Sequence, residues 1–212
     1  MPLQNRVDPF GDIHAVTARG MFTGNRGVIH DPMTRSLLKR RWTTKAWIIC
    51  LCEFRRRRRE VMGRNSPSGR AGWTELFFLD EVTALAAGHR PCFYCRREEA
   101  KAYAACFGDA FGIAKPRAPA IDAMLHGQRR AAGGRYVVID ERQLNGLPDG
   151  AMVAMDGKAH TKRGGTLLAW SFEGYEPAQM MGRERLELVT PLATVEVLRA
   201  GYRPVWHASA ET

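Results

Sequence analysis

Two cysteines three positions apart are the residues whose spacing most clearly indicates chemistry in this chain. Cys92 and Cys95 flank Phe-Tyr, follow Pro91, and precede a segment of helical composition. A Cys-x-x-Cys turn brings two thiolates close enough to bind one tetrahedral ion, and the N-terminal end of a helix favours their negative charge. We therefore predict that both cysteines bind zinc. The alternatives are a redox pair, disfavoured because no βαβ pattern surrounds it, and two structural thiols.

The remaining zinc ligands are sought upstream, where Cys50 and Cys52 lie in the expected strand WIICLCEF. Residues two apart on a strand share a face but lie about 6.6 Å apart, because each residue advances about 3.3 Å. Only a bulge would let both sulfurs reach one ion, so we expect one of them to be a ligand. His30, next to Asp31, is the candidate for the last position, and an ordinary surface histidine is the alternative.

Residues 77–97, FFLDEVTALAAGHRPCFYCRR, resemble the second half of the zinc-binding module of the Ada family of alkylation-repair proteins. In that module a strand and a short helix ending in Ala-Gly-aromatic-Arg-Pro lead into Cys-x-x-Cys. The resemblance covers about a tenth of the chain and implies that Cys92 and Cys95 are the downstream zinc pair, with Arg90 in the turn of the motif. It also implies a four-cysteine zinc site in which one cysteine accepts a methyl group from a DNA phosphotriester. The family's upstream Cys-x-x-x-Cys has no counterpart here, since no cysteine lies between Cys52 and Cys92.

The positive charge of the chain is confined to its first third. Residues 1–72 contain 15 Lys and Arg against 5 Asp and Glu, and residues 73–212 contain 17 of each kind, so the first part carries the whole net charge of +10. A one-sided basic region attracts polyanions, which favours nucleic acid, and DNA first, as the partner. A solvated basic face and an acidic protein partner are the alternatives. The arginines expected to contact nucleic acid are Arg55, Arg56, Arg57, Arg58, Arg59, Arg64 and Arg70.

One pair of residues is a candidate for catalysis. Asp122 and His126 are four apart on an expected helix and share one face, with Arg129 within a turn. A carboxylate that orients an imidazole near arginines can act as a general base beside a phosphate, as a nuclease requires. The alternative is a surface Asp-His pair. The sequence contains no HNH, HExxH, Walker or GxSxG motif, so no familiar hydrolase is indicated.

The elements that must position these residues predict an α+β fold. In residues 1–132 we expect an irregular arm, a basic β-hairpin with strands at 47–62 and 73–79, a short helix from Asp80 to Gly88, the Cys-x-x-Cys zinc turn, and helices from about 96 and over 118–132. From residue 135 onward, short alternating stretches between Asn-Gly and Asp-Gly turns predict a small antiparallel β-meander or barrel with a C-terminal helix, so that 135–212 forms a second region.

Composition sets the class of protein. The chain is 45% hydrophobic and 25% charged, which is typical of a globular protein, and no apolar run approaches the roughly 18 residues of a membrane span. The N-terminus has no secretory signal, so we expect a cytoplasmic protein with reduced thiols. The sequence thus predicts a nucleic-acid-binding protein with a structural zinc and a role in DNA repair or processing. The alternatives are a DNA-processing enzyme, either a nuclease or a zinc-thiolate alkyl acceptor, and a zinc-stabilised protein-interaction module.

Overall fold

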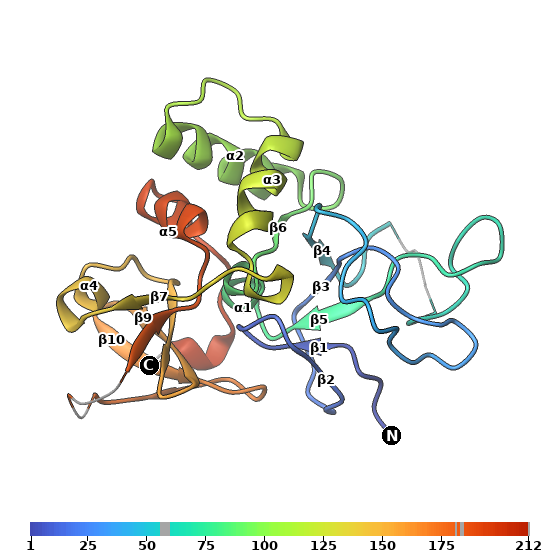
Figure 1. The fold of residues 1–212 in the computed structure, drawn as a ribbon, viewed down its shortest axis with the longest axis horizontal. Coiled ribbons are helices and arrows are strands. Elements are labelled where there is room, and N and C mark those ends of the chain that lie inside the picture. The colour runs from blue at the N-terminus through green and yellow to red at the C-terminus, as the bar shows by residue number, and fades with distance from the viewer. Residues whose placement is uncertain (56–59, 181, 183–184, 212) are drawn as a thin grey trace.

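Two six-stranded sheets contain the strands of the computed structural model, which describes residues 1–55, 60–180, 182 and 185–211. In spatial order the first sheet consists of β2 (Ile13–His14), β1 (Arg6–Val7), β5 (Leu76–Phe78), β3 (Phe22–Asn25), β4 (Ile48–Leu51) and β6 (Arg90–Pro91). The second consists of β11 (Tyr175–Pro177), β10 (Thr166–Trp170), β9 (Lys158–Arg163), β8 (Met152–Met155), β12 (Leu186–Leu188) and β7 (Val137–Ile139). Figure 1 shows the two sheets at opposite sides of the molecule.

The helices complete an α+β fold, which confirms the predicted class. They are α1 (Glu81–Ala86), α2 (Arg97–Phe111), α3 (Ala118–Gln128), α4 (Glu141–Asn145) and α5 (Leu192–Arg199), with short 3₁₀ turns η1 (Arg130–Ala132) and η2 (Ala208–Ala210). Helices α2, α3 and α5 contact one another and form a group on one side of the molecule (Figure 1). No helix of the described residues is both long enough and apolar enough to cross a membrane.

Helix α1 forms where the sequence places its capping signals. The Asp80 carboxylate accepts hydrogen bonds from the backbone N–H and the hydroxyl of Thr83, at 2.8 and 2.7 Å, which satisfies the free N–H groups of the first turn. Gly88 has φ +83, a left-handed conformation that ends the helix without a Cβ clash. The chain then enters β6, so the helix sets the direction in which Arg90 and the two cysteines approach the first sheet.

The expected β-hairpin does not form, because β3 lies between its two strands. Strand β3 is antiparallel to β4 on one side and to β5 on the other, so the arm of residues 1–45 contributes strands to the sheet. Gly24 makes this close approach possible, since a Cβ at that position would lie 2.1 Å from the carbonyl oxygen of Ile48. Strand β4 ends at Leu51, and the predicted continuation through residues 56–59 lies outside the described residues.

The second sheet agrees with the predicted antiparallel meander. Strands β8, β9, β10 and β11 pair in sequence order, and β12 returns to pair with β8 and β7, every pair being antiparallel. A single buried cluster contains residues from both sides of the expected boundary near Gly133, including Ile49, Tyr103, Val153 and Leu198. The two sheets and the helices therefore share a hydrophobic core.

Candidate metal centre

Three cysteine sulfurs meet at the edge of the first sheet. The Sγ atoms of Cys50, Cys92 and Cys95 all lie within 4.8 Å of one another, close enough to hold a metal ion. Cys50 lies on β4, and the other two follow β6, which pairs with β4 in parallel. The backbone N–H of Cys92 donates to the carbonyl oxygen of Ile49 at 3.0 Å, which continues the ladder past β6. Strand pairing therefore brings Cys50 beside two cysteines that are more than 40 residues away in sequence.

The segment between the two downstream cysteines is folded back on itself. The N–H of Arg96 donates to the carbonyl oxygen of Cys92 at 3.0 Å, and the N–H of Tyr94 donates to the Cys92 sulfur at 3.4 Å. The thiols of Cys50 and Cys95 also donate toward Cys92, and these hydrogen bonds lower the pKa of Cys92. The contact with Cys92 raises the pKa of Cys50. The Cys92 thiol is thus the one whose deprotonation is favoured, and the thiolate is the form of cysteine that binds a metal.

A pocket of about 440 Å³ lies directly against the three cysteines, all of which line it. Phe54, Trp73, Phe77 and Tyr94 contribute aromatic rings to its walls. A pocket of this size and character is typical of small-molecule binding, because apolar walls exclude water and a few polar groups fix orientation. The sulfurs are therefore reachable by a group that enters the pocket.

Cys52 and His30, the other candidate ligands, do not belong to the three-sulfur group that the described residues form. Cys52 is exposed just beyond the end of β4, and its sulfur lies 3.5 Å from the carbonyl oxygen of Met21. The His30 imidazole is buried elsewhere, where Nδ1 lies 2.7 Å from the Thr74 hydroxyl and Nε2 lies 3.4 Å from the carbonyl oxygen of Gly63. The structure therefore selects Cys50 among the upstream candidates, because β4 pairs with β6 up to that point.

Several of the predicted nucleic-acid-binding arginines lie near the pocket or in exposed loops. The Arg55 guanidinium lies over the rings of Phe54 and Tyr94, at 5.2 and 5.4 Å from their centroids. Arg64 and Arg70 are exposed in the loop between β4 and β5. Arg56, Arg57, Arg58 and Arg59 lie outside the described residues. Among the predicted arginines that the structure describes, Arg55 thus adjoins the aromatic residues that line the pocket.

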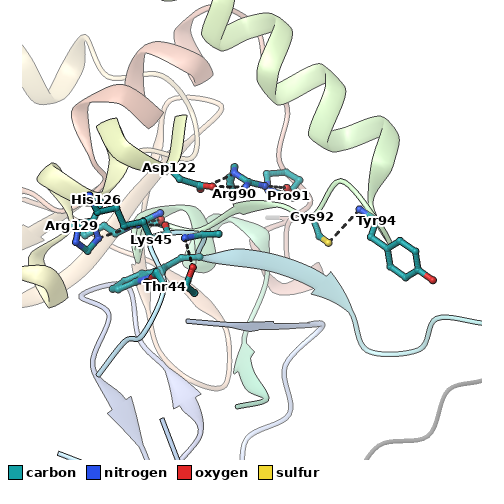
Figure 2. Close-up of polar contacts among 12 residues, drawn as sticks. Thr44, Lys45, Arg90, Pro91, Cys92, Tyr94, Asp122, His126 and Arg129 are labelled. Carbon is teal, nitrogen blue, oxygen red and sulfur yellow. Dashed lines mark hydrogen bonds and ion pairs between the residues drawn. The ribbon is translucent and has the colours of Figure 1, made fainter. Parts of the chain in front are cut away.

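The proposed catalytic pair of Asp122 and His126 is not arranged as a dyad. Asp122 is 5% exposed, and its carboxylate accepts two hydrogen bonds from Arg90, at 2.9 Å from Nε and 2.7 Å from Nη2. His126 instead lies 3.5 Å from Nη1 of Arg129 and packs edge-on against Trp42. Figure 2 shows Asp122 directed at Arg90, one residue before the turn that carries Cys92. Asp122 therefore positions the cysteine segment and is not free to orient the imidazole.

The pocket was not anticipated from the sequence, although a signal for it exists. Trp73, Glu75 and Phe77 alternate along the chain, and all three line the pocket. Residues two apart on an extended segment share a face, so the alternation predicts a common surface for these side chains. What the alternation does not reveal is that this surface faces the three cysteines.

Comparison with known proteins identifies no relative. No protein family matches the chain, and neither a curated protein nor a solved structure gives a match. The chemistry of the site must therefore be inferred from the residues themselves.

Proposed function

We propose that this protein is a zinc-containing nucleic-acid-binding protein. The observation that carries the proposal is the three-cysteine group, which lines an aromatic pocket beside Arg55. Cys50 and Arg55 belong to residues 1–72, the part of the chain that carries its whole net positive charge. The metal ion and the nucleic acid would then bind at the same surface of the protein. The local resemblance to the Ada zinc module supports a role in DNA repair or processing.

Zinc fits the donor set better than other common metals. Soft thiolate ligands select zinc over magnesium or calcium, which prefer oxygen. Tetrahedral bonds of about 2.3 Å to one zinc ion place the bound sulfurs about 3.8 Å apart. The three sulfurs here lie within 4.8 Å of one another, so a small closing movement brings them to this spacing. A zinc ion held by three protein ligands keeps a fourth position for water or substrate. Cys50, Cys92 and Cys95 would hold the ion, and the pocket that they line would receive the fourth ligand.

Metal content tests the first half of the proposal. The native protein is expected to contain one zinc per chain by elemental analysis, and Cys50→Ser, Cys92→Ser and Cys95→Ser are each expected to lose most of it. Cys52→Ser and Cys106→Ser are matched controls, because these cysteines lie outside the three-sulfur group of the described residues. Metal-free protein from a gentle purification, or equal zinc loss in the controls, would refute the assigned ligands.

Salt-dependent binding tests the second half. Nucleic-acid affinity should fall as salt rises, with a slope of about 0.9 per phosphate contact on a log–log plot for duplex DNA. The triple variant Arg55→Ala, Arg64→Ala, Arg70→Ala should bind more weakly with a smaller slope. Arg135→Ala, Arg142→Ala, Arg203→Ala removes the same charge from exposed positions of the C-terminal half and serves as control. Equal weakening by both triple variants would show that total charge, and not the N-terminal surface, determines binding.

A zinc-thiolate alkyl acceptor is the second candidate, favoured by the opening of the cysteine group into the pocket. A sulfur lone pair of Cys50, Cys92 or Cys95 would form a bond to the alkyl carbon of a phosphotriester. The carbon–oxygen bond would break, and its electron pair would leave on the oxygen of the resulting phosphodiester. Incubation with a methyl-phosphotriester oligonucleotide followed by peptide mass spectrometry should then find one methylated cysteine of the three. An unmodified protein after complete incubation would exclude this chemistry for methyl groups.

A further inference from the structure

The pocket beside the cysteine group has an exposed aromatic rim. The side chains of Trp73 and Tyr94 are 45% and 55% exposed, although both line the pocket. Large aromatic rings that remain partly exposed at a pocket are typical of a binding surface, because rings that serve only the hydrophobic core are buried. Figure 2 shows the Tyr94 ring directed away from the turn that carries Cys92. The Tyr94 ring is therefore exposed at the pocket, with the Arg55 guanidinium over it.

Two guanidinium groups next to aromatic rings of the pocket favour an anionic group at those positions. Arg55 lies over Phe54 and Tyr94, and its Nη1 is 3.4 Å from the Tyr94 hydroxyl. The Arg6 guanidinium lies 4.8 Å from the centroid of Phe77, another ring that lines the pocket. Two guanidinium groups next to the aromatic walls disfavour a cationic occupant and attract phosphate. A ligand that combines an aromatic plane with a phosphate backbone satisfies both the rings and the arginines.

We propose that the pocket receives an unstacked base of a single-stranded nucleic acid, with Trp73 and Tyr94 as the stacking platforms. The proposal rests on the nucleic-acid binding proposed above and deepens it. In a duplex the base faces are covered by neighbouring bases, so a face-on contact requires a single strand or a base that has left the stack. Thr23, Asn25 and Glu75 also line the pocket and provide polar groups for the edge of a base.

The position of the carboxylate of Glu75 is fixed by the protein, which makes it a suitable edge contact. Glu75 is 5% exposed, and its Oε2 accepts a hydrogen bond from the N–H of Met62 at 2.9 Å. Its Oε1 lies 3.3 Å from the Asn65 amide nitrogen. A carboxylate held in this way at the pocket wall accepts hydrogen bonds from exocyclic amino groups, so bases that carry one are preferred over thymine. A preference for bases with an exocyclic amino group would distinguish recognition of the base edge from apolar contact with the ring alone.

The test compares zinc-loaded protein with oligonucleotides that differ only in their bases. Fluorescence anisotropy would measure affinity for a labelled single strand of about 12 cytosines, within the usual range of single-strand site sizes, and for an abasic strand of equal phosphate number. The cytosine strand is expected to bind more tightly by about 5- to 160-fold, since one stacked base contributes about 1–3 kcal/mol. Trp73→Ala and Tyr94→Ala should remove most of this advantage and leave abasic binding unchanged.

Matched variants separate stacking from folding. Trp73→Phe keeps an aromatic ring and should retain most of the advantage, and Trp42→Ala removes an exposed tryptophan that packs on His126 and should have no effect. Equal affinity for the cytosine and abasic strands would overturn base binding while leaving phosphate-driven nucleic-acid binding intact. Binding of neither strand would overturn both this inference and the proposed function. Loss of the advantage in Trp42→Ala to the same extent as in Trp73→Ala would also refute the assignment.

Discussion

Arg96 and Glu81 form a buried ion pair of two parallel hydrogen bonds. Nη1 of Arg96 donates to Oε1 of Glu81 at 2.8 Å and Nη2 donates to Oε2 at 2.9 Å, with both side chains at most 1% exposed. Arg96 directly follows the last cysteine of the three-cysteine group, and Glu81 is the first residue of α1. The pair therefore fixes the cysteine turn to the helix that precedes it.

Glu81 also holds the C-terminal segment. The Tyr202 hydroxyl donates to its Oε1 at 2.7 Å, and the N–H of Val205 donates to its Oε2 at 2.9 Å. One carboxylate thus joins the cysteine turn and residues 202–205, which follow α5. Because every partner of this carboxylate is arranged around a negative charge, removal of the charge affects both regions.

Replacement of Glu81 should strongly destabilise the protein. Glu81→Gln leaves the buried Arg96 guanidinium without its counter-charge, and the loss of one partner of a buried ion pair costs about 3–5 kcal/mol. Urea unfolding followed by fluorescence measures the change in the free energy of unfolding. Glu99→Gln is the matched control, since Glu99 lies 3.7 Å from the same guanidinium but is 45% exposed. The control should change stability by less than about 1 kcal/mol, and an equal effect of the two variants would contradict the importance of the buried pair.

The Asp122 carboxylate is predicted to act in stability rather than in catalysis. Arg90 and Asp122 are both 6% exposed in their ion pair, so Asp122→Asn should lower the free energy of unfolding by about 3 kcal/mol. His126→Ala removes an edge contact with Trp42 and should cost about 1 kcal/mol or less. Unfolding curves of the two variants test this ranking. An Asp122→Asn protein as stable as the unmodified protein would contradict this structural role of the Arg90–Asp122 pair.

Zinc is expected to stabilise the fold through the three cysteines. At a free zinc concentration about 100 times the dissociation constant, an ion that binds only the folded state adds about 2.7 kcal/mol. The midpoint temperature of thermal unfolding of chelator-treated protein should therefore rise as zinc is added. The shift should vanish in Cys50→Ser and persist in Cys52→Ser, which differs by the same atom two positions away. A shift that persists in Cys50→Ser would place the ion elsewhere.

Local signals made the helices predictable, whereas the first sheet depends on distant partners. The Asp80 cap, Thr83 and Gly88 all lie within one short segment, so α1 could be located from the sequence alone. Strand β3 is Phe-Thr-Gly-Asn, whose last two residues are disfavoured in strands, and it forms because β4 and β5 supply hydrogen-bonding partners on either side. The predicted hairpin is wrong because β3 pairs with both β4 and β5 and so separates the two strands that were expected to pair with each other.

The three-cysteine group likewise depends on distant partners. Cys92 and Cys95 were identified from local spacing, and their sulfurs do belong to the three-sulfur group. The choice between Cys50 and Cys52 required the register of β4 against β6, which places Ile49 opposite Pro91 and so brings Cys50 beside Cys92. A period-two pattern is identical for the two upstream cysteines, so spacing alone does not separate them.

His89 is enclosed in the core in a way that should make the protein sensitive to acid. Its ring lies 5.2 Å from that of Trp47 and 4.7 Å from that of Phe78 by centroid distance, and Nε of Arg26 donates to its Nε2 at 3.3 Å. Burial, followed by the positive charges of Arg26 and Arg129, holds the pKa of His89 well below its ordinary value of 6.5. The folded protein therefore contains a neutral imidazole in the pH range in which the unfolded chain begins to bind a proton.

Stability should consequently fall as the pH drops below about 6.5. In that range the unfolded state binds one proton more than the folded state at this position, which lowers the free energy of unfolding by up to about 1.4 kcal/mol per pH unit. His89→Gln keeps an acceptor for Arg26 but does not titrate, so its stability should depend less steeply on pH between 6.5 and 5. Urea unfolding of both proteins at the same series of pH values gives the difference, in which contributions shared by the two chains cancel. Parallel pH profiles would show that His89 accepts a proton in the folded state as readily as in the unfolded chain.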